Sequence, residues 1–283
     1  MSSWNLIIDI ARCHDCNDCF LADKDEFVGN DFPPYSAAQP WHGQRWMNIE
    51  RGERGQYPLV MTRYLPKPCM HCDAAPCLSG DGAVYKREDG LVIIDPLKAK
   101  GRPEIVDTCP YGAIYWNDEA QLAQKCTGCA HLIDAGWTET RCSQVCPTGA
   151  IRLVLGDEAA MAALVEAEDL EVYQPELGSR PRVYYKNLYR WTKAFIGANV
   201  AFKDTDEVAE GARMTVSLEG AVVGTAVASN YGDVIVDKLE PGKQYQVEIA
   251  IAGYETSACT VALDESRNLG VILLEKTAAG AEA

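Results

Sequence analysis

The stretch from Lys125 to Ile151 constrains this chain more than any other part of its sequence, and it reads KCTGCAHLIDAGWTETRCSQVCPTGAI. Cys126 and Cys129 form a CxxC pair, Cys142 follows, and Cys146 stands directly before a proline. Three thiolates and a Cys-Pro ending are typical of iron–sulfur ligation, in which the cysteine before proline ligates the other cluster of a pair. The stretch therefore predicts a matching set of thiolates elsewhere in the chain.

The matching set lies near the N-terminus, in ARCHDCNDCFLAD. It has CxxCxxC spacing, through Cys13, Cys16 and Cys19, but the fourth position is Asp23. A further set repeats the Cys-Pro-x-Gly-Ala-Ile ending, and its members are Cys69, Cys72, Cys77 and Cys109. Two such endings indicate a duplicated bacterial ferredoxin-like domain.

The exchange of the last cysteine assigns the ligands to three clusters, each expected to be [4Fe–4S]. The first takes Cys13, Cys16, Cys19 and Cys146. The second takes Asp23, Cys126, Cys129 and Cys142. The third takes Cys69, Cys72, Cys77 and Cys109. The duplication would allow a fourth cluster, but both halves of its ligand set are missing together, because Asp81 replaces one cysteine and GRPEIVDT, before Cys109, has none.

Asp23 is the only ligand of the three sets that is not a thiolate. A carboxylate is a harder and more exchangeable donor, so this corner is expected to be the weaker one. Three alternatives stay open from sequence: an Asp-ligated [4Fe–4S] cluster, a [3Fe–4S] cluster or water-ligated corner, and a different nearby ligand.

The twelve cysteines must also be weighed against disulfides and structural zinc. A disulfide framework is disfavoured because the N-terminal sequence does not resemble a secretion signal, and the triplet and Cys-Pro endings favour iron–sulfur over zinc. Cys259, far from the others in sequence, is expected to be a buried core thiol. His71 and His131 are expected to form hydrogen bonds near cluster sulfurs, and Lys125 to raise a cluster potential by its charge.

The net charge of −15 disfavours nucleic acid and anionic membranes as partners. No apolar run approaches the roughly 20 residues of a membrane helix, so no membrane contact is predicted. The expected location is the cytoplasm, although export together with a signal-bearing partner stays open. No nucleophile elbow, phosphate loop or acid–base constellation is present, so no catalytic residue is predicted.

The predicted fold class is α+β. Residues 1–156 are predicted to form the ferredoxin-type domain, with an inserted loop region at 28–68 and a hairpin within 83–95. The insertion is locally basic, which indicates either a solvated face or a docking surface. Residues 157–197 are predicted to be a helix and an extended arm that wraps its own domain or contacts another subunit. Residues 198–276 are predicted to form an antiparallel β-sandwich, and 277–283 a tail.

The stretch from Leu239 to Tyr254 resembles prealbumin-like or collagen-binding B-repeat modules. The whole chain resembles the iron–sulfur subunits of the dimethyl sulfoxide reductase family of molybdopterin enzymes. Within that family it is similar to the small subunits of pyrogallol–phloroglucinol transhydroxylase and resorcinol hydroxylases. The resemblance rests on RWMNIERGERGQYP, KPCMHCDAAPC, GAVYKREDGLVIIDP, DTCPYGAIYW, QKCTGCAHLIDAGW and PELGSRPRVYYKNLYR.

The resemblance implies a heterodimer or larger complex with a large subunit that carries a molybdenum bis-pterin cofactor and the site for a polyhydroxylated aromatic. This chain would bind no substrate and would relay single electrons through three clusters. These relatives carry Cys at the position of Asp23, which puts the type of the second cluster in doubt. The alternatives are the same subunit in a respiratory reductase for arsenate, polysulfide or sulfoxide, a free-standing multicluster ferredoxin, and an interaction protein with structural clusters.

Overall fold

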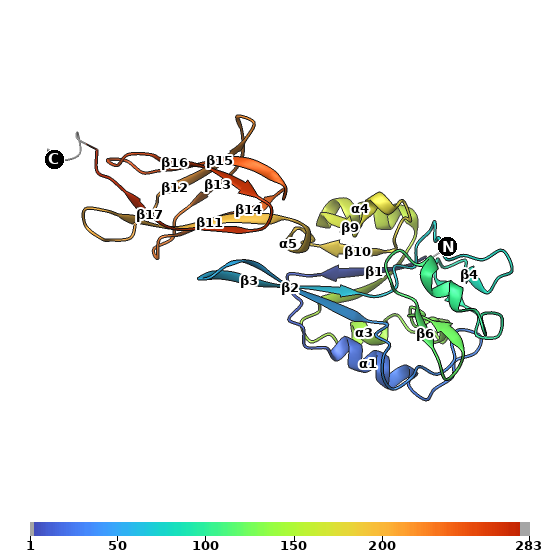
Figure 1. Cartoon of the computed structure of the whole chain (residues 1–283). Coiled ribbons are helices and arrows are strands. Elements are labelled where there is room, and N and C mark those ends of the chain that lie inside the picture. The colour runs from blue at the N-terminus through green and yellow to red at the C-terminus, as the bar shows by residue number, and fades with distance from the viewer. Residues whose placement is uncertain (1–2, 278–283) are drawn as a thin grey trace. The chain divides into compact units, whose positions relative to one another are not determined.

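The computed structural model describes residues 3–277, which fall into two compact units (Figure 1). The first unit is Met1–Arg51 with Tyr64–Leu188, and the second is Gly52–Arg63 with Tyr189–Ala283. Apart from its first residue, the predicted tail at 277–283 lies outside the described residues. Within residues 3–277, no helix combines the length and the apolar character that crossing a membrane requires.

A four-stranded sheet of order β8-β1-β10-β9 forms the base of the first unit. Its central strand β1 (Ser3–Asp9) runs antiparallel to β8 (Ile151–Gly156) and parallel to β10 (Val183–Lys186), which pairs with β9 (Leu170–Val172). The sequence WNLII, apolar except for Asn5, is buried along its whole length, as expected for a strand covered on both faces. On one face, α4 (Glu158–Glu168) packs Met161 against Ile7 and Leu170.

Short elements connect the cysteine loops of the first unit. The helices are α1 (Asp18–Phe27), α2 (Ala130–Asp134), α3 (Arg141–Gln144) and the 3-10 helix η1 (Pro103–Thr108). The hairpins are β4 (Val84–Lys86) with β5 (Val92–Ile94), and β6 (Tyr115–Asn117) with β7 (Leu122–Gln124). The predicted hairpin within 83–95 is thus confirmed, and a strand follows the cysteine loops as expected (Figure 1).

The prediction of an irregular loop throughout 28–68 is wrong for its second half. Strands β2 (Asn48–Gln56) and β3 (Leu59–Lys67) form a two-stranded sheet there, and the tip at 52–63 belongs to the second unit. The many charged side chains of NIERGERGQ obscure its strand character in the sequence. The arm at 170–191 also differs from a plain extended segment. It contains β9, the 3-10 helix η2 (Pro175–Leu177), β10 and the first part of α5 (Tyr189–Thr192), so it supplies two strands to the sheet of its own domain.

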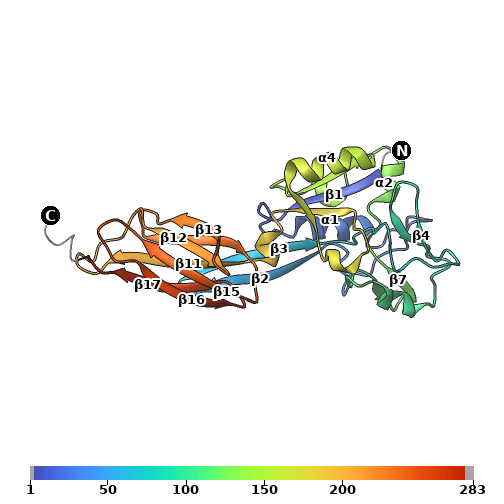
Figure 2. The ribbon, with the colours of Figure 1, turned by 90° about the horizontal axis from the view of Figure 1, so that it is seen from above.

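The second unit is built of strands (Figure 2), which form two sheets of order β14-β11-β17 and β13-β12-β15-β16. The strands are β11 (Ala194–Phe202), β12 (Arg213–Leu218), β13 (Ala221–Val227), β14 (Asp233–Leu239), β15 (Lys243–Ala250), β16 (Ser257–Leu263) and β17 (Arg267–Leu274). Side chains from both sheets, including Ile196, Met214 and Tyr245, form one shared core. Two details differ from expectation: the first strand begins at Ala194 rather than near 198, and β11 pairs with β17 in parallel.

Cys259 is exposed, so its prediction as a buried core thiol is wrong. It lies on β16, the edge strand of the four-stranded sheet, where the inward positions Val261 and Leu263 are buried. The alternation of the strand would place Cys259 on the same side as these two residues. The core cluster includes Val261 and Leu263 but does not extend to Cys259.

Candidate metal centres

The first thiol set joins the N-terminal loop to the end of α3. Cys19 lies in the first turn of α1, and burial raises its pKa, with further increases from the nearby thiols of Cys142 and Cys13. Burial also raises the pKa of Cys13, with Cys146 and Cys16 among its neighbouring charges. The structure therefore brings residue 146 together with the N-terminal loop that contains residues 13, 16 and 19. Cys16 is the exposed member of this set.

The second set lines a small cavity in the first unit. All four predicted ligands contribute to its wall, namely Asp23, Cys126, Cys129 and Cys142. Burial raises the pKa values of Cys126 and Cys129 well above the ordinary range, and raises that of Cys142 to about 11. Thiols that are this reluctant to ionise without a counter-charge fit a site that is completed by a metal, because a thiolate is the form that ligates it.

Hydrogen-bond donors already surround the sulfurs of this second set. The backbone N–H of Gly128 donates to Cys126 Sγ at 3.4 Å, and that of Arg141 donates to Cys129 Sγ at 3.4 Å. The Thr140 hydroxyl oxygen lies 3.1 Å from Cys142 Sγ. Donors to ligand sulfurs raise the potential of a cluster by stabilising its more negative reduced state.

Asp23 faces this cavity from α1 and is only 6% exposed. Burial raises its pKa to about 7, and within residues 3–277 its carboxylate accepts a single hydrogen bond, from Gln39 Nε2 to Oδ2, at 3.3 Å. In the described part of the chain, no basic side chain forms an ion pair with it. A buried carboxylate beside three thiols, with so little compensation from the protein, is chemically suited to binding a cation.

The third set comprises two loops on either side of the β4–β5 hairpin. Burial raises the pKa of Cys72 to about 11 and that of Cys77 to about 12, and Cys69 and Cys109 raise both further. For Cys109, burial raises the pKa, Cys69 adds to the increase, and a hydrogen bond from the Ala113 N–H opposes both. The four predicted ligands at 69, 72, 77 and 109 therefore lie close together.

The duplicated Cys-Pro endings have the same backbone conformation. Cys146 Sγ accepts a hydrogen bond from the Ala150 N–H at 3.2 Å, four residues ahead, as Cys109 does from Ala113. The glycine within each ending is left-handed, with φ of 63° at Gly112 and 61° at Gly149. Burial acts to raise the pKa of Cys146, but hydrogen bonds from the Thr148 hydroxyl and from backbone N–H groups outweigh it and lower the pKa.

The two segments that lack the ligands of a fourth cluster lie against each other. Arg102 Nη1 donates to Asp81 Oδ2 at 2.5 Å, and Arg102 Nε donates to Glu104 Oε1 at 2.9 Å. The Ser79 hydroxyl, the Ala83 N–H and Arg102 hold the pKa of Asp81 at about 2. An ion pair thus occupies the position that the duplication would otherwise give to a cluster, which agrees with a coherent loss.

No three His, Cys, Asp or Glu side chains in the described residues converge as ligands of a single metal ion. In a cubane each thiolate ligates a different iron, so the ligands of a cluster do not converge on one ion. Two buried donors near the second set also lack protein acceptors, namely Trp4 Nε1 and His71 Nε2. Inorganic sulfides would supply such acceptors, so the residues present fit an iron–sulfur cluster.

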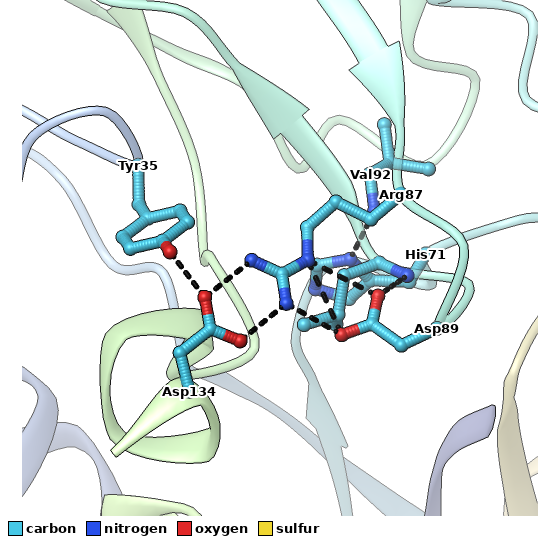
Figure 3. A network of polar contacts seen from close by, with 7 residues as sticks. Tyr35, His71, Arg87, Asp89, Val92 and Asp134 are labelled. Carbon is cyan, nitrogen blue, oxygen red and sulfur yellow. Dashed lines mark hydrogen bonds and ion pairs between the residues drawn. The ribbon is translucent and has the colours of Figure 1, made fainter. Parts of the chain in front are cut away.

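His71 and His131 form contacts through different ring nitrogens. His71 Nδ1 accepts a hydrogen bond from the Val92 N–H at 3.0 Å, which leaves the proton on Nε2 (Figure 3). His131 Nε2 lies 2.8 Å from Glu26 Oε1, and its ring stacks on that of Phe32. The hydrogen bond to a cluster sulfur stays a prediction for both histidines, because His71 Nε2 and His131 Nδ1 are each buried without a partner among the described residues.

A network around Arg87 holds the segment that follows Cys126 and Cys129 against the β4–β5 hairpin (Figure 3). Arg87 donates to both carboxylate oxygens of Asp134, at 2.9 and 2.6 Å, and to Asp89, while the Tyr35 hydroxyl donates to Asp134. Hydrogen bonding to Arg87 is the main reason that the pKa of Asp134 is lowered to about 2. Because Asp134 ends the short helix that begins after Cys129, the network fixes this segment.

Sequence reasoning identified the thiols that the structure brings together but missed several residues around them. Trp4 sits in a strand pattern, where an indole is expected to be core, and nothing in the sequence indicates its unpaired N–H. Thr140 could have been suspected as a helix N-cap, since threonine is favoured at that position. Gly128 is recognisable only as the glycine within a CxxC loop.

Comparison with known proteins agrees with this geometry. The family model of the 4Fe-4S dicluster domain matches residues 60–156. The chain is 46% identical to the pyrogallol hydroxytransferase small subunit of Pelobacter acidigallici, over 97% of this chain and 100% of that protein. It is 37% identical to the beta subunit of the dimethylsulfide dehydrogenase of Rhodovulum sulfidophilum, over 52% of this chain and 46% of that one. It is 31% identical to the electron transfer subunit of the thiosulfate reductase of Salmonella typhi, over 60% and 84%. The chain therefore belongs to the family of iron–sulfur subunits of molybdoenzymes that includes the pyrogallol hydroxytransferase small subunit.

Proposed function

We propose that this chain is the electron-transfer subunit of a molybdopterin-dependent oxidoreductase or hydroxytransferase that acts on polyhydroxylated aromatic compounds. The observation that carries the proposal is the identity along nearly the whole chain to the small subunit of a pyrogallol hydroxytransferase, together with three thiol sets in the first unit. The partner is a large subunit with a molybdenum bis-pterin cofactor, in a heterodimer or larger complex.

Three iron–sulfur clusters are proposed, each held by one set. Cys13, Cys16, Cys19 and Cys146 hold the first. Asp23, Cys126, Cys129 and Cys142 hold the second. Cys69, Cys72, Cys77 and Cys109 hold the third. Each bound cluster supplies a site that accepts and releases one electron, while the chain sets its potential through ligand type, hydrogen bonds and burial.

The thiols of the second set interact electrostatically with thiols of both other sets. The thiol of Cys19, in the first set, is affected by Cys142 of the second. The thiol of Cys126, in the second set, is affected by Cys69 of the third. These links support a row in which electrons pass between the first and third clusters through the second.

Asp23 is proposed as the fourth ligand of this central cluster. Its burial, its position on the wall of the thiol-lined cavity and its lack of an ion-pair partner in the described chain support the assignment. Because a carboxylate exchanges more readily than a thiolate, the iron at this corner is the one most easily lost, which would give a [3Fe–4S] cluster. For the second unit we propose a prealbumin-like sandwich, supported by its two sheets around one core.

Spin-quantified EPR tests the role of Asp23 in the anaerobically purified complex. Asp23→Cys should convert the signal of one cluster to that of an all-thiolate [4Fe–4S] site, and Asp23→Ala should favour a three-iron signal. Asp25→Ala, on the exposed side of the same helix, should leave the spectrum as in the wild type. An unchanged spectrum in both Asp23 variants would show that this carboxylate is not a ligand.

Copurification tests the proposed function itself. A tagged chain produced in its native cells should retain a large subunit that contains molybdenum. Addition of pyrogallol or catechol compounds to the complex should change the oxidation state of its clusters. A monomer with no stable partner would instead indicate a free-standing ferredoxin. A molybdenum partner that responds to arsenate, polysulfide or sulfoxide, but not to phenols, would indicate a respiratory reductase.

A further inference from the structure

Lys125 is a buried lysine whose ammonium group has no carboxylate partner in the described chain. The residue is 4% exposed and directly follows β7. Its Nζ donates to the backbone carbonyl of Val92, on β5, and to that of Cys126 at 3.0 Å. The two carbonyl groups accept hydrogen bonds from its three N–H donors but carry no net charge to compensate that of the ammonium, and burying an uncompensated charge is costly.

The position of Lys125 places this charge between two of the thiol sets. It is bonded through the backbone to Cys126, a member of the second set. The Val92 carbonyl that accepts from its Nζ belongs to a residue whose N–H donates to His71, which lies between Cys69 and Cys72 of the third set. The charge of Lys125 also favours the ionised thiols of Cys77 and Cys109 in that set. The thiols of the first set, at Cys13 and Cys19, are affected mainly by burial and by other cysteines or Asp15.

Lys86 provides a contrast within the same unit. It also donates to the backbone carbonyl of a ligand, Cys72, at 2.9 Å. Unlike Lys125, it forms an ion pair with Asp73, at 2.9 Å. Its charge is therefore largely neutralised inside the protein, whereas that of Lys125 remains available to a negatively charged neighbour.

We propose that Lys125 is a counter-charge shared by the second and third clusters, and that it raises both of their reduction potentials together. This inference rests on the proposed function. A cluster with its ligands carries net negative charge and gains one more negative charge on reduction, so a fixed cation stabilises the reduced form more than the oxidised form. Because one ammonium group serves both clusters, it shifts both potentials in the same direction and raises them relative to that of the first.

Reduction potentials measured cluster by cluster test the proposal in the intact complex. An EPR-monitored redox titration would compare the wild type with Lys125→Met, which keeps the length of the side chain and removes the charge. We expect the midpoint potentials of the second and third clusters to fall, each by more than that of the first. Lys125→Arg should keep both near the wild-type values, and Lys86→Met should produce smaller shifts than Lys125→Met.

Each outcome decides for or against the proposal. Unchanged potentials in Lys125→Met, or shifts no larger than those in Lys86→Met, would overturn it. If Lys125→Met fails to retain the second and third clusters, their retention in Lys125→Arg would support the counter-charge. Loss in both variants would overturn it, because the site would then depend on the shape of lysine and not on its charge. Wild-type protein without clusters would instead refute the proposed function.

Discussion

Gly128 illustrates how closely single residues shape the second site. Its φ of +66° lies in the left-handed region, and a Cβ at this position would come 2.4 Å from Leu91 Cδ2 and 3.3 Å from His71 Nε2. Neither the backbone conformation nor the space admits an L side chain. The loop between Cys126 and Cys129 therefore depends on glycine for both reasons.

Gly128→Ala should destabilise the first unit by about 2–4 kcal/mol and reduce the iron content by that of one cluster, since it combines backbone strain with overpacking. Gly136→Ala is a matched control, because Gly136 is also left-handed at +88° but has open space around it. It should cost about 1 kcal/mol and retain all iron. Thermal unfolding measures the loss of stability in both variants, and iron analysis measures their cluster content. An equal loss of stability in the two variants would contradict the packing argument.

Thr140 has two functions that can be separated by substitution. Its hydroxyl oxygen accepts a hydrogen bond from the Ser143 N–H at the start of α3 and lies near Cys142 Sγ. Thr140→Val should cost about 1 kcal/mol through loss of the cap and should lower the potential of the second cluster. Thr140→Ser keeps the hydroxyl and should retain both properties. If the potential in Thr140→Val equals that of the wild type, the contact between the Thr140 hydroxyl and Cys142 Sγ does not influence the cluster potential.

At the scale of residues, the sequence was most informative where chemistry fixes the spacing. The cysteine triplet and the Cys-Pro endings identified the thiols that the structure brings together, because cluster ligation tolerates few spacings. Cys259 shows the limit of this reasoning, since hydrophobic alternation does not tell how far along an edge strand the core extends. The sequence also did not show that Lys125 lacks a carboxylate partner in the described chain, because ion pairs can form between residues that are far apart in sequence.

Among the elements, the β2–β3 hairpin was the least predictable from sequence. Its Arg54 side chain is 3% exposed and forms an ion pair with Asp237, within the second unit. The Arg54 guanidinium also lies 5.2 Å from the centre of the Phe195 ring. A buried arginine reads as a surface residue in any hydrophobicity pattern, so the strand it belongs to looked like a basic loop.

Arg54→Met should destabilise the second unit by about 2 kcal/mol. Breaking a fully buried pair costs roughly 3–5 kcal/mol, and the value here is smaller because Asp237 is 30% exposed and can be solvated. Glu53→Gln, at the neighbouring exposed position, should change stability by less than about 0.5 kcal/mol. Chemical denaturation of the two variants gives the comparison, and a cost for Arg54→Met no larger than the control would contradict the role of the pair.

For the whole molecule, the duplication was visible in sequence and the sheet order was not. Both Cys-Pro endings and the missing ligands of a fourth site are local patterns in the sequence. In the structure, the Asp81–Arg102 ion pair joins the two segments that lack these ligands. The parallel pairing of β1 with β10 joins residues near the two ends of the first unit. No local pattern encodes such a distant pairing, so the arm at 170–191 could be placed only from the structure.

Removing the clusters should affect the two units differently. The first unit buries many thiols and Lys125 around its metal sites, so its folding depends on bound iron and sulfide. The second has its own core and no predicted metal ligand. Calorimetry of holo and chelator-treated protein should show that the transition of the first unit falls or disappears while that of the second stays within about 2 °C. A parallel fall of both transitions would contradict this separation.

The central claim is that three iron–sulfur clusters relay electrons through the first unit, and metal analysis tests it most directly. Protein purified without oxygen should be brown and contain about twelve iron atoms and about twelve acid-labile sulfides per chain, or about eleven irons if the Asp23 corner is empty. Colourless protein with little iron and no acid-labile sulfide would contradict the account.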